Sequence, residues 1–166
     1  MKTTFKIEVS GVVFKINSQF GYAKEFCKDF LTQKVEDYEI STTLEEIKEE
    51  QARYTEKYLP QQVETTCIYR HIARLLPLKN KIVAHGVALK YKNNGYLFVA
   101  PSGTGKTTHT NLWKRYLGKE VEIINGDKPI LEFAPSGIIL HSNPWCGKEG
   151  IYTKTSAPLK AICIIG

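Results

Sequence analysis

The sequence predicts an α/β protein in which a small α+β lobe precedes a strand-rich core that carries a phosphate-binding loop (P-loop). Three observations predict this fold class. The first half of the chain holds two helical patterns, and short apolar strand patterns dominate from about residue 80 onward. In the second half, a glycine-rich loop stands between a strand pattern and a helix pattern. We therefore expect two domains, an α+β lobe over residues 1–79 and a nucleotide-binding core over residues 80–166.

The elements of the first half follow from turn and capping signals. Residues 2–9 and 12–17 have the patterns of two strands on either side of Ser10-Gly11, which predicts a β-hairpin. A helix or an irregular aromatic segment follows over residues 19–33, and then a short strand. Thr43, with Glu46 three residues later, forms a capping-box pattern at the start of a charged helix over residues 44–54. Apolar residues at helical spacing predict a second, half-buried helix over residues 63–76, ended by Pro77.

The second half is rich in strands. Its one clear helix pattern covers residues 107–117 and stops at Gly118, and Asn93-Asn94-Gly95 predicts a turn between two strands. The last apolar run, residues 161–166, leaves two interpretations open: the domain ends on this strand, or the core continues beyond Gly166. The expected strands cover residues 81–84, 87–91, 96–100, 121–125, 129–133, 137–141 and 159–165.

Composition and charge indicate which kinds of protein and which partners the sequence fits. Of the 166 residues, 42% are hydrophobic and 24% are charged, as in globular domains. The net charge of +6 suits an anionic ligand such as a nucleotide, or an acidic protein partner. The lysines and arginines are dispersed, so we expect no nucleic-acid partner. No apolar run approaches the ~20 residues that span a bilayer, and no secretory signal stands at the N-terminus, so we expect a cytoplasmic protein without a membrane partner.

The four cysteines do not indicate a metal or disulfide framework. They lie far apart in the chain, and no pair has the C-x-x-C spacing of a zinc site. In the expected cytoplasmic setting, disulfides are disfavoured as well. We therefore interpret all four as thiols, namely Cys27, Cys67, Cys146 and Cys163.

The segment Ala100-Pro101-Ser102-Gly103-Thr104-Gly105-Lys106-Thr107-Thr108 fits the P-loop pattern G-x-x-x-x-G-K-[ST], with Ala100 in place of the first glycine. Glycines allow successive backbone N–H groups to turn around phosphate oxygens, and the following helix adds a partial positive charge. A chance glycine turn before a helix is the alternative. The pattern predicts nucleotide contacts at Ser102, Gly103, Thr104, Gly105, Lys106, Thr107 and Thr108, with Lys106 on the β/γ-phosphates and the Thr107 hydroxyl on Mg²⁺.

Three further features accompany this loop. His85 follows a strand before it, and Asp127 ends a strand after it, where P-loop enzymes place an acid that holds magnesium or accepts a proton. Lys148 stands in a polar loop and could contact phosphate or substrate. Each has a structural alternative: a structural histidine, a turn-forming aspartate and a solvated lysine. His109, directly after the loop, could contact the nucleotide or lie on the surface, and His141 is interpreted as a structural or surface residue.

Five ordered motifs in the second half carry a resemblance to a known family: His85–Leu89, Ala100–Thr108, His109–Trp113, Ile124–Pro129 and Pro144–Lys148. With them, residues 85–166 resemble the catalytic domain of the HPr kinase/phosphorylase family. The resemblance is closer to its small bacterial relatives, described as HPr serine kinase-like or phosphoenolpyruvate carboxykinase-like proteins. It implies a core of the HPr kinase/phosphoenolpyruvate carboxykinase type. The first half carries no specific motif.

The resemblance implies ATP- and Mg²⁺-dependent phosphoryl transfer to a serine-type hydroxyl of a protein or small molecule. By position, His85 matches a histidine near the transferred phosphate, and Lys106 and Thr107 match the phosphate and metal ligands. Asp127 matches the second of two adjacent acids, the base toward the hydroxyl, and would also contribute to the metal site. Gly126 stands where the family has the first acid, which puts one metal contact and activity in doubt. Because the family tends to oligomerise, a homo-oligomer is implied too.

Two other functions remain open. Gly126 and the early C-terminus favour a nucleotide-binding accessory or regulatory module with little catalysis of its own. The segment 102–108 also resembles the loop of phosphoenolpyruvate carboxykinases. Those enzymes are far longer, however, and no residues for oxaloacetate or Mn²⁺ can be assigned in this chain.

Overall fold

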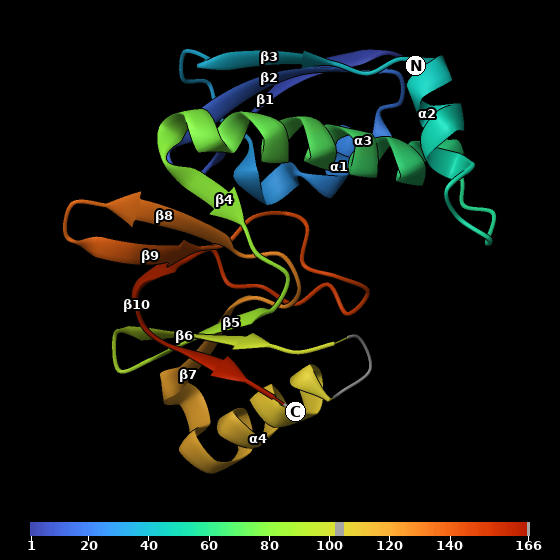
Figure 1. The fold of residues 1–166 in the computed structure, drawn as a ribbon. Coiled ribbons are helices and arrows are strands. Elements are labelled where there is room, and N and C mark those ends of the chain that lie inside the picture. The colour runs from blue at the N-terminus through green and yellow to red at the C-terminus, as the bar shows by residue number, and fades with distance from the viewer. Residues whose placement is uncertain (102–104, 166) are drawn as a thin grey trace. The chain divides into compact units, whose positions relative to one another are not determined.

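The protein is a mixed α/β, strand-rich chain with two compact units, residues 1–79 and 80–166. The computed structural model describes residues 1–101 and 105–165, and of Thr107 only the backbone. Within these residues, unit 1 holds a three-stranded sheet and three helices, and unit 2 holds a seven-stranded mixed sheet and one helix (Figure 1). The units divide where the sequence changes from helical to strand-rich character.

The hairpin predicted at the N-terminus is confirmed. Strands β1 (Thr3–Val9) and β2 (Val12–Ser18) pair antiparallel. Ser10 and Gly11 join them with φ angles of 52° and 74°, as a type I′ turn requires. Strand β3 (Tyr38–Ser41) adds to β2 in parallel, which also confirms the expected third strand.

The helices of unit 1 differ from expectation mainly at their ends. The aromatic segment forms a short helix, α1 (Tyr22–Phe26), and a 3₁₀ turn, η1 (Lys28–Phe30). Helix α2 (Leu44–Gln51) ends three residues early, and α3 (Pro60–Leu75) begins three residues early because proline fits the first turn of a helix. A second 3₁₀ turn, η2 (Leu76–Lys79), follows α3.

Only half of the predicted capping box is found. Thr43 Oγ1 accepts a hydrogen bond from Glu46 N at 3.1 Å, so Thr43 is the N-cap of α2. The carboxylate of Glu46, however, lies 2.8 Å from His71 Nε2 on α3. The side chain that the pattern assigns to the helix start therefore joins two helices.

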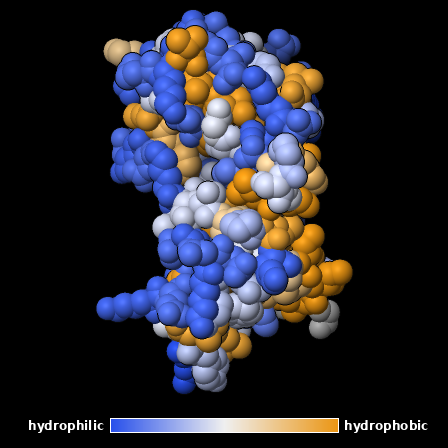
Figure 2. Space-filling view, turned by 90° about the vertical axis from the view of Figure 1, so that its left-hand side faces the viewer, coloured by the Kyte–Doolittle hydropathy of each residue, from blue (hydrophilic) through white to orange (hydrophobic). Residues whose placement is uncertain are grey.

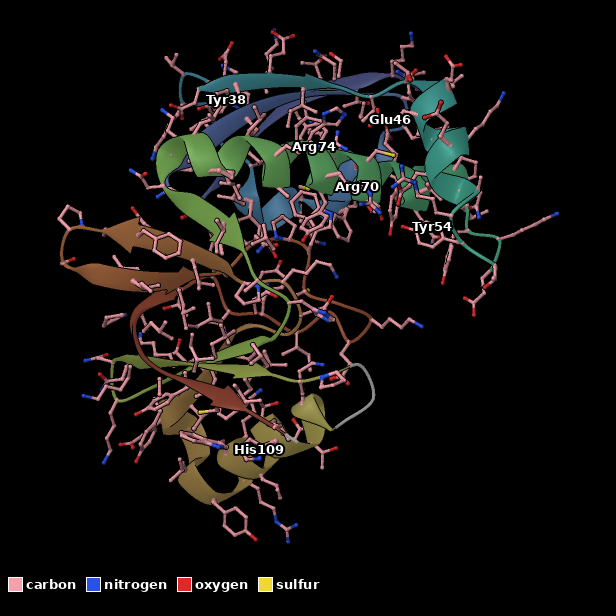
Figure 3. The ribbon with its side chains drawn as sticks, viewed as in Figure 1. Tyr38, Glu46, Tyr54, Arg70, Arg74 and His109 are labelled. Atoms are coloured by element: carbon pink, nitrogen blue, oxygen red, sulfur yellow. The ribbon has the colours of Figure 1, made fainter. Side chains whose placement is uncertain are left out.

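Two buried carboxylates join separate segments of unit 1 through hydrogen bonds. Glu64 on α3 is fully buried and accepts hydrogen bonds from the backbone N–H groups of Gln19 and Phe20 and from the Thr42 hydroxyl. Glu50 on α2 accepts from Tyr54 Oη at 2.8 Å and Arg70 Nη2 at 2.9 Å, two residues that Figure 3 labels. Burial raises the pKa of Glu50, but the bonds from Arg70 and Tyr54 outweigh it, and the pKa is lowered.

The sheet of unit 2 confirms all seven expected strands, six of them within two residues at each end, whereas β10 begins three residues earlier than expected. Its order is β4-β8-β9-β10-β6-β5-β7, and of the strand pairs in the described part of the chain only β10/β6 is parallel in this sheet. Residues 156–158 of β10 pair with β9, and residues 159–164 pair with β6, so this strand joins the two halves of the sheet. The bounds are β4 (Lys81–Val83), β5 (Val87–Tyr91), β6 (Asn94–Val99), β7 (Val121–Asn125), β8 (Ile130–Ala134), β9 (Gly137–His141) and β10 (Ser156–Ile164).

Strand alternation divides the core of unit 2 into two clusters. Leu89, Phe98 and Ile123 belong to one cluster, against which Trp113 of helix α4 (Lys106–Leu117) packs. Leu97, Ile124 and other residues form a second cluster with Leu131 and Leu140 of the β8/β9 hairpin. Helix α4 follows the expected bounds within one residue and ends at Gly118, whose φ is 67°. A short 3₁₀ turn, η3 (Gly118–Glu120), leads into β7.

The predicted turn at Asn93-Asn94-Gly95 is wrong by one position. Lys92 and Asn93 are the turn residues, with φ angles of 46° and 64°, and Asn94 already pairs with Tyr91 in the hairpin. Gly95 lies within β6, where a Cβ would stand 2.9 Å from Leu140 Cδ1. This glycine serves close packing rather than the turn.

Hydrophobic side chains gather along one side of unit 2 in Figure 2. Exposed apolar residues of unit 2 include Phe133 on β8 and Ile162 and Ile164 on β10. Among the described residues, no helix combines the length and the apolar character needed to cross a membrane.

Candidate functional site

A cavity of about 490 Å³ opens in unit 2 where the start of β5, the end of β7 and the start of α4 come together. Three residues predicted for the site, His85, Lys106 and Asp127, line it. They come from three separate elements: His85 follows β4, Asp127 follows β7, and Lys106 begins α4. Lys148, the predicted phosphate or substrate contact, lines the same cavity and is exposed.

His85 and Asp127 are direct neighbours. The Nε2 atom of His85 lies 3.2 Å from Asp127 Oδ1. The backbone fixes this approach, because Gly86 N donates to the Asp127 carbonyl at 2.9 Å. A Cβ on Gly86 would stand 2.6 Å from the Phe98 carbonyl oxygen, so only glycine allows the chain before β5 to approach β6 this closely. The histidine itself stays 63% exposed and accessible from the cavity.

Lys128 forms an ion pair with the second oxygen of the same carboxylate. Its Nζ atom contacts Asp127 Oδ2, and the exposed fractions of the two side chains are 34% and 22%. Both oxygens of Asp127 thus have a partner on the protein. Lys128 stands in the motif Ile124–Pro129, but the sequence predicts no role for it, because spacing does not show where a side chain turns.

Asn125 fixes the turn that presents Asp127. Its side chain is fully buried at the end of β7. The Oδ1 atom accepts hydrogen bonds from Asp127 N at 2.9 Å and Lys128 N at 2.7 Å, and Nδ2 donates to the carbonyls of Asn143 and Trp145. One amide therefore joins the Asp127 turn to the loop after β9. The only sequence signal for this role is an asparagine directly before a glycine.

The loop after β9 closes against this turn because two glycines leave room for it. A Cβ on Gly126 would stand 2.9 Å from the Cys146 carbonyl oxygen and 3.1 Å from that of Ile151. A Cβ on Gly147, whose φ is 83°, would stand 2.8 Å from the Cβ of Asp127. The chain thus has no space for a second acidic side chain beside Asp127 at position 126.

Part of the predicted P-loop lies outside the described residues, namely Ser102, Gly103, Thr104 and the side chain of Thr107. What is described is the entrance to α4. Gly105 has φ 88° and lines the cavity, and Lys106 Nζ donates to the carbonyls of Ala100 and Pro101 at 2.9 and 3.1 Å. The lysine therefore bends back toward the first residues of the loop. Thr108 is exposed on the first turn.

His109, the alternative nucleotide contact, lies on the packed side of α4. Its ring stands 4.9 Å from that of Phe98, and its Nε2 accepts from Trp113 Nε1 at 3.3 Å (Figure 3). Because this ring packs against the sheet, the structure favours a packing role for His109.

The donor set at Asp127 provides part of a magnesium site, which water and nucleotide phosphates would complete. Among the described residues, no three His, Cys, Asp or Glu side chains gather as a metal cage. Magnesium, however, is held in many enzymes by one or two carboxylates, water and substrate phosphates. Asp127 at the cavity wall supplies one such carboxylate.

A second charged cluster joins strands β4, β8 and β9 of the same sheet. Lys81 on β4 lies 2.7 Å from Glu132 on β8, whose other oxygen lies 2.6 Å from His141 Nε2 on β9. The bond from Lys81 lowers the pKa of Glu132, despite partial burial. Burial lowers the pKa of His141, although Glu132 opposes this shift. His141 therefore has a structural role, one of its two predicted alternatives.

No protein-family model matches the chain, and a search of curated proteins gives no matching relative.

Proposed function

We propose that unit 2 is a nucleotide-binding core of the HPr kinase/phosphoenolpyruvate carboxykinase type that transfers the γ-phosphoryl group of ATP to a serine-type hydroxyl. The observation that carries this proposal is the convergence of His85, Asp127 and Lys106 on one cavity from three elements. An acid, a histidine and a lysine at the start of a helix are the groups that phosphoryl transfer needs for positioning and charge neutralisation.

Lys106 would hold the nucleotide phosphates together with the N-terminus of α4. Its ammonium group donates to the Ala100 and Pro101 carbonyls, from which it can turn toward a bound phosphate. The helix start contributes backbone N–H groups and a partial positive charge at the same place. Asp127, with the Thr107 hydroxyl, would hold a magnesium ion that neutralises phosphate charge when the nucleotide is bound.

Asp127 would also accept the proton of the attacking hydroxyl. The contact from His85 leaves this carboxylate oriented at the cavity wall, and its other oxygen faces Lys128. His85 would orient the carboxylate or donate a hydrogen bond to the transferred phosphoryl group. A single aspartate would then serve both as metal ligand and as base.

A nucleotide-binding accessory module is the second candidate, and Gly126 favours it. The closed loop leaves no place for an acidic side chain at position 126, so metal binding at this turn would depend on the carboxylate of Asp127. Such a site can hold Mg-ATP without efficient transfer.

Transfer of labelled phosphate from ATP, with Mg²⁺ and an array of serine-containing peptides, tests the kinase. We expect label on an acceptor with the wild-type chain, and no transfer with Lys106→Ala. Equal transfer by both proteins contradicts the proposal. Tight Mg-ATP binding without transfer to any acceptor favours the accessory module.

A further inference from the structure

The side chain of Asp127 is engaged on both of its oxygens before any ligand arrives. His85 faces Oδ1 at 3.2 Å, and the Lys128 ammonium group contacts Oδ2. An ammonium group beside a carboxylate occupies the position that a cation would take. The carboxylate that the proposed function assigns to magnesium is therefore already paired with a cation from its own chain.

The surrounding loop leaves the turn without a second carboxylate, so the pairing of Asp127 with Lys128 affects any metal that binds there. A second carboxylate at position 126 could bind the metal together with Asp127, but Gly126 lies against the carbonyls of Cys146 and Ile151 and leaves no room for it. Asp127 is the one carboxylate that the Asn125–Lys128 turn offers to the cavity. A metal that binds at this turn has to compete with Lys128.

We propose that Lys128 is a resident counter-ion of Asp127 that a divalent cation must displace, so that this lysine sets the metal affinity of the site. This inference rests on the proposed function, because it takes Asp127 as the metal-holding carboxylate. It goes further in assigning a role to Lys128, and it makes the metal affinity a property of an ion pair within the chain.

The local structure allows the ammonium group to move while the backbone stays in place. Lys128 N donates to Asn125 Oδ1 at 2.7 Å, and the Lys128 carbonyl accepts from Asn143 Nδ2 at 2.5 Å. The side chain leaves this fixed backbone on a flexible four-carbon stem and is 34% exposed. After displacement, its charge remains close enough to the cavity to favour phosphate oxygens.

Binding of Mn²⁺ alone, followed by the relaxation of water protons, tests this role without turnover. We expect Lys128→Met to bind Mn²⁺ about fivefold more tightly than the wild type, as for loss of a partly exposed ion pair. Lys128→Arg keeps the charge and should bind as the wild type does. Asp127→Asn should abolish Mn²⁺ binding, both in the wild-type protein and in combination with Lys128→Met.

Lys148→Met is the matched control. It removes the same charge from a residue that lines the cavity beside Asp127, but the described ion pairs of Asp127 do not include Lys148. Its effect on Mn²⁺ affinity should be at most about twofold. If Lys128→Met binds Mn²⁺ no more tightly than Lys148→Met, or if Asp127→Asn changes nothing, the inference is overturned.

Binding of a fluorescent ATP analogue in EDTA to the same proteins separates this inference from the function. Analogue binding by the wild type, together with unchanged Mn²⁺ affinity in Lys128→Met, overturns the counter-ion role and leaves the nucleotide site standing. If the wild type binds neither the analogue nor Mn²⁺, the proposed function and the inference both fail.

Discussion

A Cβ atom on Gly126 would stand 2.9 Å from the carbonyl oxygen of Cys146. This separation is shorter than real Cβ contacts, and the opposing atom is backbone, which cannot turn away as a side chain could. Gly126 is therefore a structural requirement of the closed loop.

Gly126→Asp should consequently destabilise the protein and should not improve metal binding or transfer. We expect a loss of about 2 kcal/mol in the free energy of unfolding, as for other overpacked sites, measured by urea denaturation. Gly21→Ala is the control, since its Cβ would meet only Thr3 Oγ1 at 3.6 Å. Increased transfer activity in Gly126→Asp would show that the loop can open and accept the acid.

Asn125→Leu should be the most damaging single change near the site. It leaves two backbone N–H groups and two carbonyls at a fully buried position without their amide partner. We expect a loss of about 3 kcal/mol in urea denaturation. Asn111→Leu, an exposed change on α4, should stay within about 0.5 kcal/mol. Similar stability of the two variants would contradict the role assigned to Asn125.

Stability should fall in mild acid because of His141. Its folded pKa lies below the ordinary value of 6.5, mainly through burial, so below pH 6.5 the unfolded chain takes up a proton that the folded chain resists. The free energy of unfolding then decreases, by at most about 1.4 kcal/mol per pH unit for one group. Glu132, whose pKa is lowered from 4.5, adds a similar loss only at lower pH. Urea denaturation at pH 7.5 and 5.5 should show a smaller change in His141→Gln than in the wild type; equal changes would refute this assignment.

The thiols should react at very different rates. Burial raises the pKa of Cys27 and of Cys67 to about 12, and it also raises that of Cys146, so these groups carry little thiolate at pH 8. Cys163 is partly exposed on β10. Ellman's reagent should therefore modify one thiol rapidly in the native protein, and Cys163→Ser should abolish this phase. A rapid phase that survives in Cys163→Ser would show that a buried thiol is accessible.

Local patterns predicted the elements well where side-chain alternation and capping decide them. The hairpin at Ser10-Gly11, the Thr43 cap and helix α4 are examples. The errors arise where contacts with a segment distant in sequence determine the role of a residue. Gly95 was assigned to a turn because its contact with Leu140 is invisible in sequence, and the helix over residues 63–76 gave no sign that Glu64 would be a buried acceptor.

The site was predicted as a set of residues but not as a network. The motifs named His85, Lys106, Asp127 and Lys148, which line one cavity in the structure. Hydrogen bonds and close approaches between segments distant in sequence define the roles of Asn125, Lys128 and Gly147, and no periodicity or spacing encodes such contacts.

Calorimetric titration of ATP in magnesium buffer tests the central claim, that the start of α4 and the cavity beside it bind a nucleotide. We predict saturable binding by the wild-type protein, weakened about tenfold or more in Lys106→Ala through loss of a charge-assisted phosphate contact. No detectable binding by the wild type, or equal affinity in the two proteins, would contradict the claim.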